Sequence, residues 1–246
     1  MATARFWSLP RAGPTSQWDH GAWSLACCDH EGHDLLDGNG QATPLSNFLA
    51  AHRGYRRDTE RFPKGVRALA AWDFPADGLE ALRRHWVGFD QALLSHHQME
   101  DAFLFPLYRG KHPELGEVVD QLEIQHEDLD ERIGDIDGLL AKLPAPDVVD
   151  QTVAALESFD AVVNQHLDLE EQHIVPLMVA EPPVPPGGGP PPVPENLDFA
   201  FVGPWLADGL DDSTVAALLA VAPPPFTVGF DENRQRYEDQ LRRWLP

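Results

Sequence analysis

The chain has 246 residues and a mass of 27.3 kDa, enough for one large domain or for an ordinary domain with long tails. Its 40 acidic and 18 basic residues give a net charge of −22, which excludes nucleic acid and anionic membrane surfaces as partners because both carry the same sign. No apolar run approaches the roughly 20 residues that span a bilayer. Residues 1–14 lack the long apolar stretch of a signal peptide, and Cys27 and Cys28 are adjacent, which disfavours a simple disulfide. We therefore expect a cytoplasmic protein.

Proline and glycine divide the chain into four parts. Residues 1–43 contain prolines and a Gly/Asp/Asn cluster and are predicted to form an irregular N-terminal flap. Residues 181–197 are rich in proline and glycine, which predicts a semi-stiff linker. The linker separates a main domain over residues 44–180 from a helical tail over residues 198–246.

Within residues 44–180 the apolar residues recur every three or four positions, the period of an amphipathic helix. The four stripes run from Leu45 to Leu69, from Leu79 to Leu107 by way of Phe103, from Leu115 to Leu140, and from Leu156 to Leu177 by way of His173. Proline or glycine lies in each of the breaks between them. Four such helices with short connections predict an all-α, up-down-up-down four-helix bundle.

Histidine interrupts each of the four stripes, and the fourth carries His173 in addition to His166. Six polar residues of the stripes are His52, His96, His126 and His166, together with Glu100 and Glu170. Each glutamate follows a histidine by four positions and therefore shares its helix face. Buried carboxylates need compensation, and a metal ion supplies it, so these six residues are candidate metal ligands.

The candidate ligands form a repeat. The pattern His96-x3-Glu100-x5-Pro106 recurs 70 residues later as His166-x3-Glu170-x5-Pro176, while the remaining histidines of the set are 74 residues apart. The chain therefore consists of two similar helix pairs, each of which supplies one histidine and one His-x3-Glu motif. Two such pairs around one axis predict a pseudo-symmetric site with room for two metals.

The order H…HxxxE…H…HxxxE, with His96 followed by His97-Gln-Met-Glu100-Asp101 and His166 followed by Leu-Asp-Leu-Glu170-Glu171, resembles the hemerythrin-like, HHE cation-binding domain. It is closer to the di-iron repair-type branch than to the oxygen carriers, which have two histidines on the third helix where this chain has His126 alone. The resemblance implies a non-heme di-iron centre whose glutamates and an oxo or hydroxo group bridge the irons; manganese or a mixed pair is an alternative. Counting about twelve coordination positions leaves roughly one open position on each iron. This favours redox chemistry on O2, peroxide or nitric oxide over reversible oxygen transport.

Other interpretations use the same residues. A ferritin-like site would use the Glu-x-x-His motifs Glu123-x2-His126 and Glu170-x2-His173, but it also needs carboxylates on the first helix, whose stripe has none. A di-iron oxygenase or oxidase would need a pocket for an organic substrate beside the metals. A non-catalytic sensor of O2 or NO, or an iron store, would use the linker and tail to transmit the state of the metals.

Several residues are candidates for supporting roles. His97, about 100° around the helix from its neighbour, and His173 are expected to lie in the second coordination shell, and Tyr55 is expected to hydrogen-bond near the site. His85 and His112 lie off the stripes and are expected to be exposed.

The two ends of the chain carry weaker signals. Cys28, His30 and His33 offer zinc-binding atoms without a recognised spacing, and Trp18 and Trp23 are expected to anchor the flap. The tail combines an apolar segment, residues 205–221, with a charged helix over residues 231–245. It is expected to cover the bundle or to mediate a homodimer or contact with a redox partner.

Overall fold

The computed structural model describes residues 35–184 and 197–245, and within them the fold is all-α, as predicted. The main helices are α1 (Ser46–Ala71), α2 (Ala76–Met99), α3 (Phe105–Lys111), α4 (Gly116–Lys142), α5 (Pro146–His173) and α6 (Val175–Ala180). A short π-helical segment, η2 (Glu100–Leu104), joins α2 to α3, and a 3-10 turn, η3 (Pro113–Leu115), precedes α4. None of the described helices combines the length and the hydropathy required to cross a bilayer.

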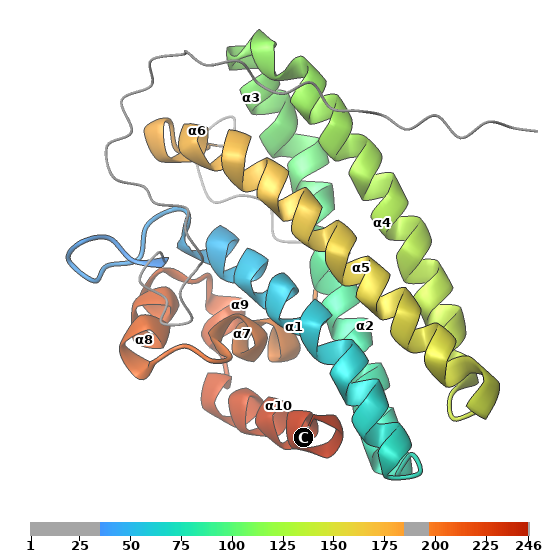
Figure 1. The fold of residues 1–246 in the computed structure, drawn as a ribbon. Coiled ribbons are helices and arrows are strands. Elements are labelled where there is room, and N and C mark those ends of the chain that lie inside the picture. The colour runs from blue at the N-terminus through green and yellow to red at the C-terminus, as the bar shows by residue number, and fades with distance from the viewer. Residues whose placement is uncertain (1–34, 185–196, 246) are drawn as a thin grey trace, which may run out of the picture.

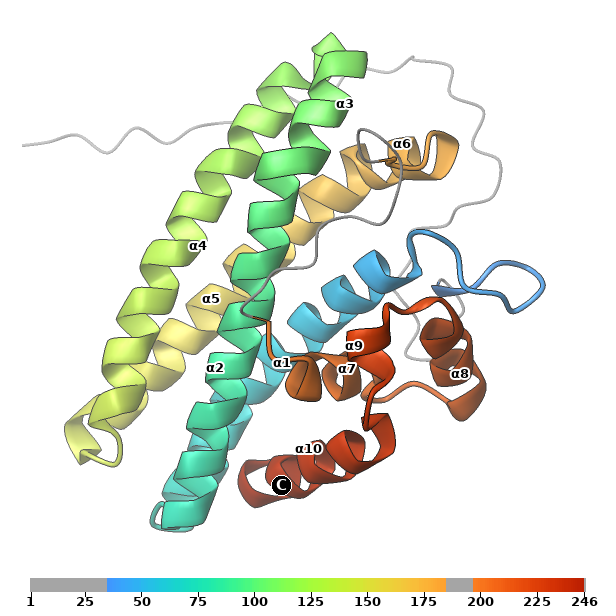
Figure 2. The same cartoon turned by 180° about the vertical axis from the view of Figure 1, so that it is seen from behind.

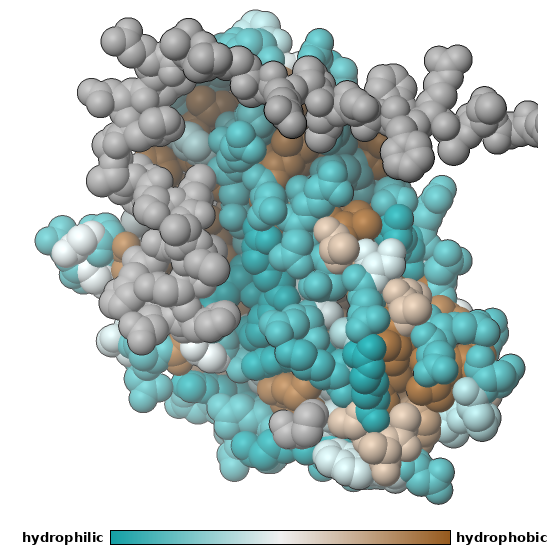
Figure 3. All heavy atoms as spheres, viewed as in Figure 1, coloured by the Kyte–Doolittle hydropathy of each residue, from teal (hydrophilic) through white to brown (hydrophobic). Residues whose placement is uncertain are grey.

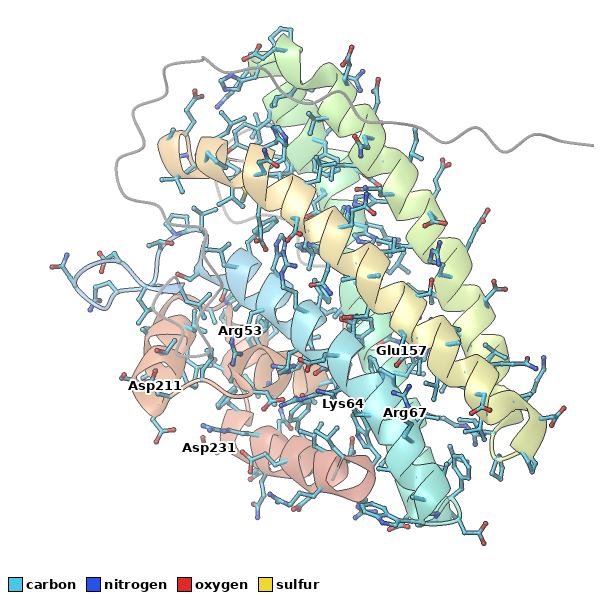
Figure 4. All side chains as sticks on the ribbon, viewed as in Figure 1. Arg53, Lys64, Arg67, Glu157, Asp211 and Asp231 are labelled. Carbon is cyan, nitrogen blue, oxygen red and sulfur yellow. The ribbon has the colours of Figure 1, made fainter. Side chains whose placement is uncertain are left out.

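Four long rods form the bundle. The first is α1, the second is α2 continued through η2 into α3, the third is α4, and the fourth is α5 continued into α6 (Figures 1 and 2). Helix α5 packs against both α1 and α4. On the outside of this contact, Arg67 of α1 pairs with Glu157 of α5 at 2.6 Å, and Figure 4 shows the two side chains directed toward each other.

The core is built by the predicted apolar stripes. Phe62 of α1, Phe89 of α2 and Phe159 of α5 are almost completely buried and meet edge to face, with centroids 5.2 and 6.2 Å apart along the series. On α4, every stripe residue from Leu115 to Leu140 is buried. In contrast, the face over α1 and α5 is mostly hydrophilic (Figure 3). Over most of their length, the predicted stripes therefore lie in the core and the residues between them face solvent.

The stripes change register after each ligand glutamate. Beyond Glu100 the predicted positions Phe103 and Leu107 are only partly buried, and Leu104 and Tyr108 occupy the core instead. The reason is the π-helical segment, whose extra residue in the turn rotates everything after it. Beyond Glu170, a break at Ile174 has a similar result: Ile174 is buried and His173 is only partly buried.

The C-terminal part of the chain forms a cap on α1 and α2. It consists of α7 (Phe199–Ala207), α8 (Asp212–Val221), α9 (Pro224–Thr227) and α10 (Phe230–Trp244). Helix α10 packs along α2, and α7 packs on α1 (Figures 1 and 2). Asp211, labelled in Figure 4, caps the N-terminus of α8, because its carboxylate accepts hydrogen bonds from the amides of Ser213 and Thr214.

Three glycines admit the aromatic side chains of the cap. A Cβ atom at Gly54 or Gly65 of α1 would lie 2.5 Å from the ring of Trp205 and 2.3 Å from that of Trp244, respectively. At Gly88 of α2 it would lie 2.6 Å from the ring of Phe201. The cap therefore docks by inserting aromatic rings where these helices carry no side chain.

A buried polar cluster lies under the cap. Asp58 of α1 is fully buried and accepts hydrogen bonds from His85 Nε2 of α2 at 2.5 Å and from Trp205 Nε1 of α7 at 2.8 Å. Arg57 Nε pairs with the same carboxylate at 2.8 Å. His85 was expected to be exposed, and this was wrong because the cap covers the α2 face on which it lies.

Candidate metal centre

Seven titratable side chains meet inside the bundle, and none of these residues is more than 8% exposed. They are His52 from α1, His96 and His97 from α2, Glu100 from η2, His126 from α4, and His166 and Glu170 from α5. Each comes from the interior face of its helix, because it occupies a position of the apolar stripe or, for His97, the position beside one. The structure thus brings together all six predicted ligands and adds a seventh residue.

The seven residues form two groups with one member in common. His52, His96, Glu100 and Glu170 make one group, which we call site A; His97, Glu100, His126 and His166 make the other, site B. Within each group one potential ligand atom per residue lies within 4.8 Å of all the others. Because Glu100 belongs to both, its two oxygens are in position to serve two metals.

Most of the polar atoms at the centre of the cluster lack hydrogen-bond partners, the exception being Nε2 of His52 and of His96, which lie 3.1 Å apart. Both carboxylate oxygens of Glu100 and of Glu170, both ring nitrogens of His97, and Nε2 of His126 and of His166 are buried without one. Leaving such atoms buried and unpaired costs free energy, on the order of 1–3 kcal/mol for each neutral group and more for a charged one. Imidazole and carboxylate are ligands that iron, manganese and zinc accept, so the donor set fits bound metal ions.

His97 was expected to be a supporting residue, but the structure places it among the candidate ligands. Its ring is 3% exposed and stacks on that of His126, with centroids 3.9 Å apart and 14° between planes. Site B lies between α2, α4 and α5 and site A between α1, α2 and α5, so the two adjacent histidines of α2 each reach one site. The sequence did contain a signal, the adjacent pair His96-His97. It was missed because the apolar stripe predicted for α2 was narrower than the face that the structure buries.

Outer partners orient three of the imidazoles. The Nδ1 hydrogen of His52 is donated to Glu171 at 2.9 Å and that of His126 to Asp101 at 2.9 Å, while His166 Nδ1 lies 3.2 Å from Gln125 Oε1. A hydrogen on Nδ1 leaves the Nε2 lone pair free for a metal. These partners fix both the tautomer and the ring orientation.

The acidic partners follow the repeat in the sequence. Each ligand glutamate is followed by a second acid, Asp101 after Glu100 and Glu171 after Glu170. Each second acid binds the histidine of the opposite helix pair, so the two halves of the repeat hold each other's ligands. The sequence interpretation included these acids in the motif but assigned them no role.

Burial keeps most of the imidazoles neutral. It lowers the pKa of His96 to about 3, assisted by the neighbouring charge of His52. Burial likewise lowers the pKa of His166 to about 3 and that of His97 well below its ordinary value. Neutral imidazole is the form that binds metal, so these three rings need no deprotonation at neutral pH.

His52 and the two glutamates behave differently. Although burial opposes it, the nearby carboxylate of Glu170, 3.4 Å away, and the hydrogen bond to Glu171 raise the pKa of His52 to about 9. Burial, and then the negative charge of Glu170, raises the pKa of Glu100 well above its usual value. The pKa of Glu170 is held below its usual range by His52 in spite of burial. In the metal-free protein, positive charge on His52 therefore balances negative charge on Glu170.

Aromatic rings enclose the site. Phe48 packs on His52 with centroids 4.3 Å apart, Phe105 stacks on His126 at 5.6 Å, and Tyr55 lies 5.3 Å from His96. The hydroxyl of Tyr55 donates to the carbonyl of Ala92 at 2.9 Å and not to a candidate ligand.

The remaining candidates lie elsewhere. His173 and Glu123 belong to neither group, which counts against a ferritin-like arrangement. The proposed zinc ligands Cys28, His30 and His33 lie outside the described residues, as do the tryptophans of the N-terminal flap. Within residues 35–184 and 197–245, sites A and B are the groups of at least three potential ligands that come within metal-binding distance.

Comparison with known proteins agrees with this geometry. Residues 43–178, more than half of the chain, match the family described as the Hemerythrin HHE cation binding domain. A search of curated proteins and of solved structures finds no match. The matched residues end at α6, so they comprise the four rods and exclude the cap. The chain therefore belongs to the hemerythrin family, and its buried histidines and glutamates offer ligand atoms that suit a bound cation.

Proposed function

We propose that the protein holds two non-heme irons, one in site A and one in site B, and that it binds and redox-processes O2, peroxide or nitric oxide. The observation that carries this proposal is the presence of Glu100 in both groups of ligands, among buried atoms that have no other partner. When bound, a pair of irons supplies the electrons and the open coordination positions for such chemistry. Manganese or a mixed pair would use the same ligands.

The two sites are not equivalent. Site B has three imidazoles, His97, His126 and His166, whereas site A has two, His52 and His96, together with Glu170. His97 thus supplies the fifth histidine that the third helix lacks. Counting Glu100, each site has four candidate ligands, so the two sites differ in the type of ligand and not in its number. Because His97 adds a fifth imidazole, fewer open positions remain than the sequence alone indicated.

The surroundings favour a small ligand over an organic substrate. Phe48, Phe105 and Tyr55 pack directly on the ligand rings, so the nearest volume on three sides is filled by the protein. The outer partners of the imidazoles, Glu171, Asp101 and Gln125, are engaged in holding the rings in place and do not offer a surface for a large molecule. This supports O2, peroxide or nitric oxide as the ligand over a larger organic substrate.

Metal analysis and rapid mixing test the proposal. We expect about two irons per chain, Mössbauer spectra with two distinct environments, and oxidation of the diferrous protein when it is mixed with O2 or peroxide in a stopped-flow instrument. A stable, reversible O2 adduct would exclude redox processing of O2, and one iron per chain would exclude the paired site.

A double variant tests the ligand assignment. His96→Ala combined with Glu100→Ala removes one ligand unique to site A and the one shared by both sites, so near-total loss of iron is expected. The matched control is His173→Ala, which removes a partly buried histidine of the same bundle from outside both groups. Equal iron contents in the two variants would overturn the assignment.

A further inference from the structure

A tyrosine and a tryptophan connect site A to the C-terminal cap. The ring of Tyr55 on α1 lies 5.3 Å from that of His96 and 5.0 Å from that of Trp205 on α7, centroid to centroid. Tyr55 and Trp205 are each 1% exposed. The three rings thus form a continuous buried series that begins at a candidate ligand and ends in the cap.

Trp205 has a proton acceptor at its indole nitrogen. Its Nε1 hydrogen is donated to Asp58 Oδ2 at 2.8 Å, and the same oxygen accepts from His85 at 2.5 Å. The guanidinium of Arg57 lies 5.7 Å from the centre of the indole ring. In spite of burial, Arg57 and His85 hold the pKa of Asp58 below its usual range, so the carboxylate would take the proton only once the indole has lost an electron and become strongly acidic. The nearby cation favours this proton transfer because it disfavours a positively charged indole.

Tyr55 lacks such an acceptor, because its hydroxyl donates to the backbone carbonyl of Ala92, which is a very weak base. Tyr55 is therefore suited to pass an electron between His96 and Trp205 through its ring. It is poorly suited to form a lasting radical, because its proton has nowhere to go. Trp205 is the first residue of the series at which both an electron and a proton can leave. Phe201 stacks beside it and is partly exposed, so this end of the series lies near the surface.

We propose that Tyr55 and Trp205 form an electron relay that carries oxidising equivalents from the metal centre to the cap and so protects the ligand histidines. This inference rests on the proposed function. In each event one electron passes from Trp205 through Tyr55 to the oxidised centre, and the Nε1 proton passes to Asp58, leaving a neutral indolyl radical. A thiol in solution returns one electron and one proton to the indole, and Asp58 releases its proton to water, which replaces the proton taken up as peroxide is reduced. Two such events reduce one hydrogen peroxide to two waters. The two thiols that supply the electrons and protons become one disulfide.

The cap provides a matched control in Trp244. Like Trp205, it is buried and inserts against a glycine of α1, Gly65 in place of Gly54. Its Nε1 has no hydrogen-bond partner, and it stacks on Phe62, which is not redox-active. Trp205→Phe and Trp244→Phe therefore remove similar volumes from the same interface, and only the first interrupts the proposed relay.

The experiment treats the iron-loaded full chain with hydrogen peroxide, freezes samples for electron paramagnetic resonance and maps oxidised residues by peptide mass spectrometry. We expect an indolyl radical in the unsubstituted protein and in Trp244→Phe. In Trp205→Phe the radical is lost and oxidation of His96 and Tyr55 rises severalfold. Iron-free protein should show neither change.

Two results would overturn the relay. In the first, the unsubstituted protein consumes peroxide, but Trp205 is oxidised no more than Trp244. This result would show that the ring series carries no electrons, and it does not depend on any variant. Absence of peroxide consumption by the iron-loaded protein would remove the proposed function with peroxide, and the relay with it. The two failures are distinguished because peroxide is measured in the same samples.

Discussion

His52 on α1 and Glu171 on α5 are joined by a 2.9 Å hydrogen bond from the Nδ1 hydrogen to the carboxylate, across the most extensively packed pair of helices. Arg56 holds Glu171 from the other side at 3.2 Å. A carboxylate in this position fixes the tautomer of a ligand histidine and raises its basicity toward a metal. The contact thus links the packing of two helices to the strength of site A.

Glu171→Ala is expected to weaken metal binding about 10–100-fold while leaving all seven candidate ligands in place. Competition with a chromophoric chelator measures the affinity. The control is Asp168→Ala, because Asp168 pairs with the same Arg56 at 2.9 Å but its side chain is 73% exposed and contacts none of the seven. An equal loss of affinity in both variants would mean that the charge near Arg56, and not the bond to His52, is responsible.

His97→Ala is expected to lower the metal content toward about one per chain, because site B loses one of its three imidazoles. The stacking on His126 is lost as well, so the spectrum of the metal that remains should differ from that of the unsubstituted protein. Metal analysis and optical spectra of the variant are compared with those of His173→Ala. Full occupancy with an unchanged spectrum would return His97 to a supporting role.

The metal-free protein should lose stability as the pH rises from about 6.5 to 9. His52 has a pKa of about 9 in the fold, against about 6.5 in an unfolded chain, so its stabilising contribution is complete below 6.5 and is lost as the pH passes 9. The difference corresponds to about 3 kcal/mol. Glu100, whose pKa is also raised, changes stability in the same direction. Thermal melting of the metal-free protein across this range measures the effect.

Metal-loaded protein is the control for this pH dependence. A metal replaces the proton on His52, so the loaded protein should show much less of the loss between pH 6.5 and 9. Titration with metal at pH 7 should release protons for the same reason. A metal-free protein whose melting temperature is constant or increases over the range would contradict the charge assignment.

Gly54→Ala should destabilise the fold by about 1–3 kcal/mol, because its Cβ would lie 2.5 Å from the buried ring of Trp205. Alanine ordinarily stabilises a helix interior relative to glycine by up to about 1 kcal/mol. Gly134→Ala on α4, where nothing lies within 4 Å of the new atom, should show that gain and serves as the control. A Gly54 variant as stable as the Gly134 variant would mean that the cap does not need this close approach. Thermal melting distinguishes the two.

Much of the molecule followed from local sequence patterns. Helical periodicity and the proline and glycine breaks predicted the all-α bundle, because a helix face repeats every three to four residues wherever it is buried. The same periodicity singled out the six residues that the structure gathers in sites A and B, since polar side chains on an apolar stripe must meet inside the bundle.

The errors arose where packing overrides periodicity. Phe103 and Leu107 were assigned to the core, but the π-helical segment rotates α3 so that Leu104 and Tyr108 are buried. His85 was assigned to the surface because the stripe of α2 was considered without the cap. A helix that contacts neighbours on two sides has two buried faces, and one stripe describes only one of them.

The sequence by itself determined the fold class, the family resemblance and the repeated His-x3-Glu pairs, all of which depend on residues close together in the chain. Tertiary structure decided that His97 shares a site with His126, that Asp101 and Glu171 hold each other's half of the repeat, and that Tyr55 lies between His96 and Trp205. These relationships join residues from different helices. The crossing and rotation of helices are set by how side chains interlock across each interface, and no periodicity within one helix specifies them.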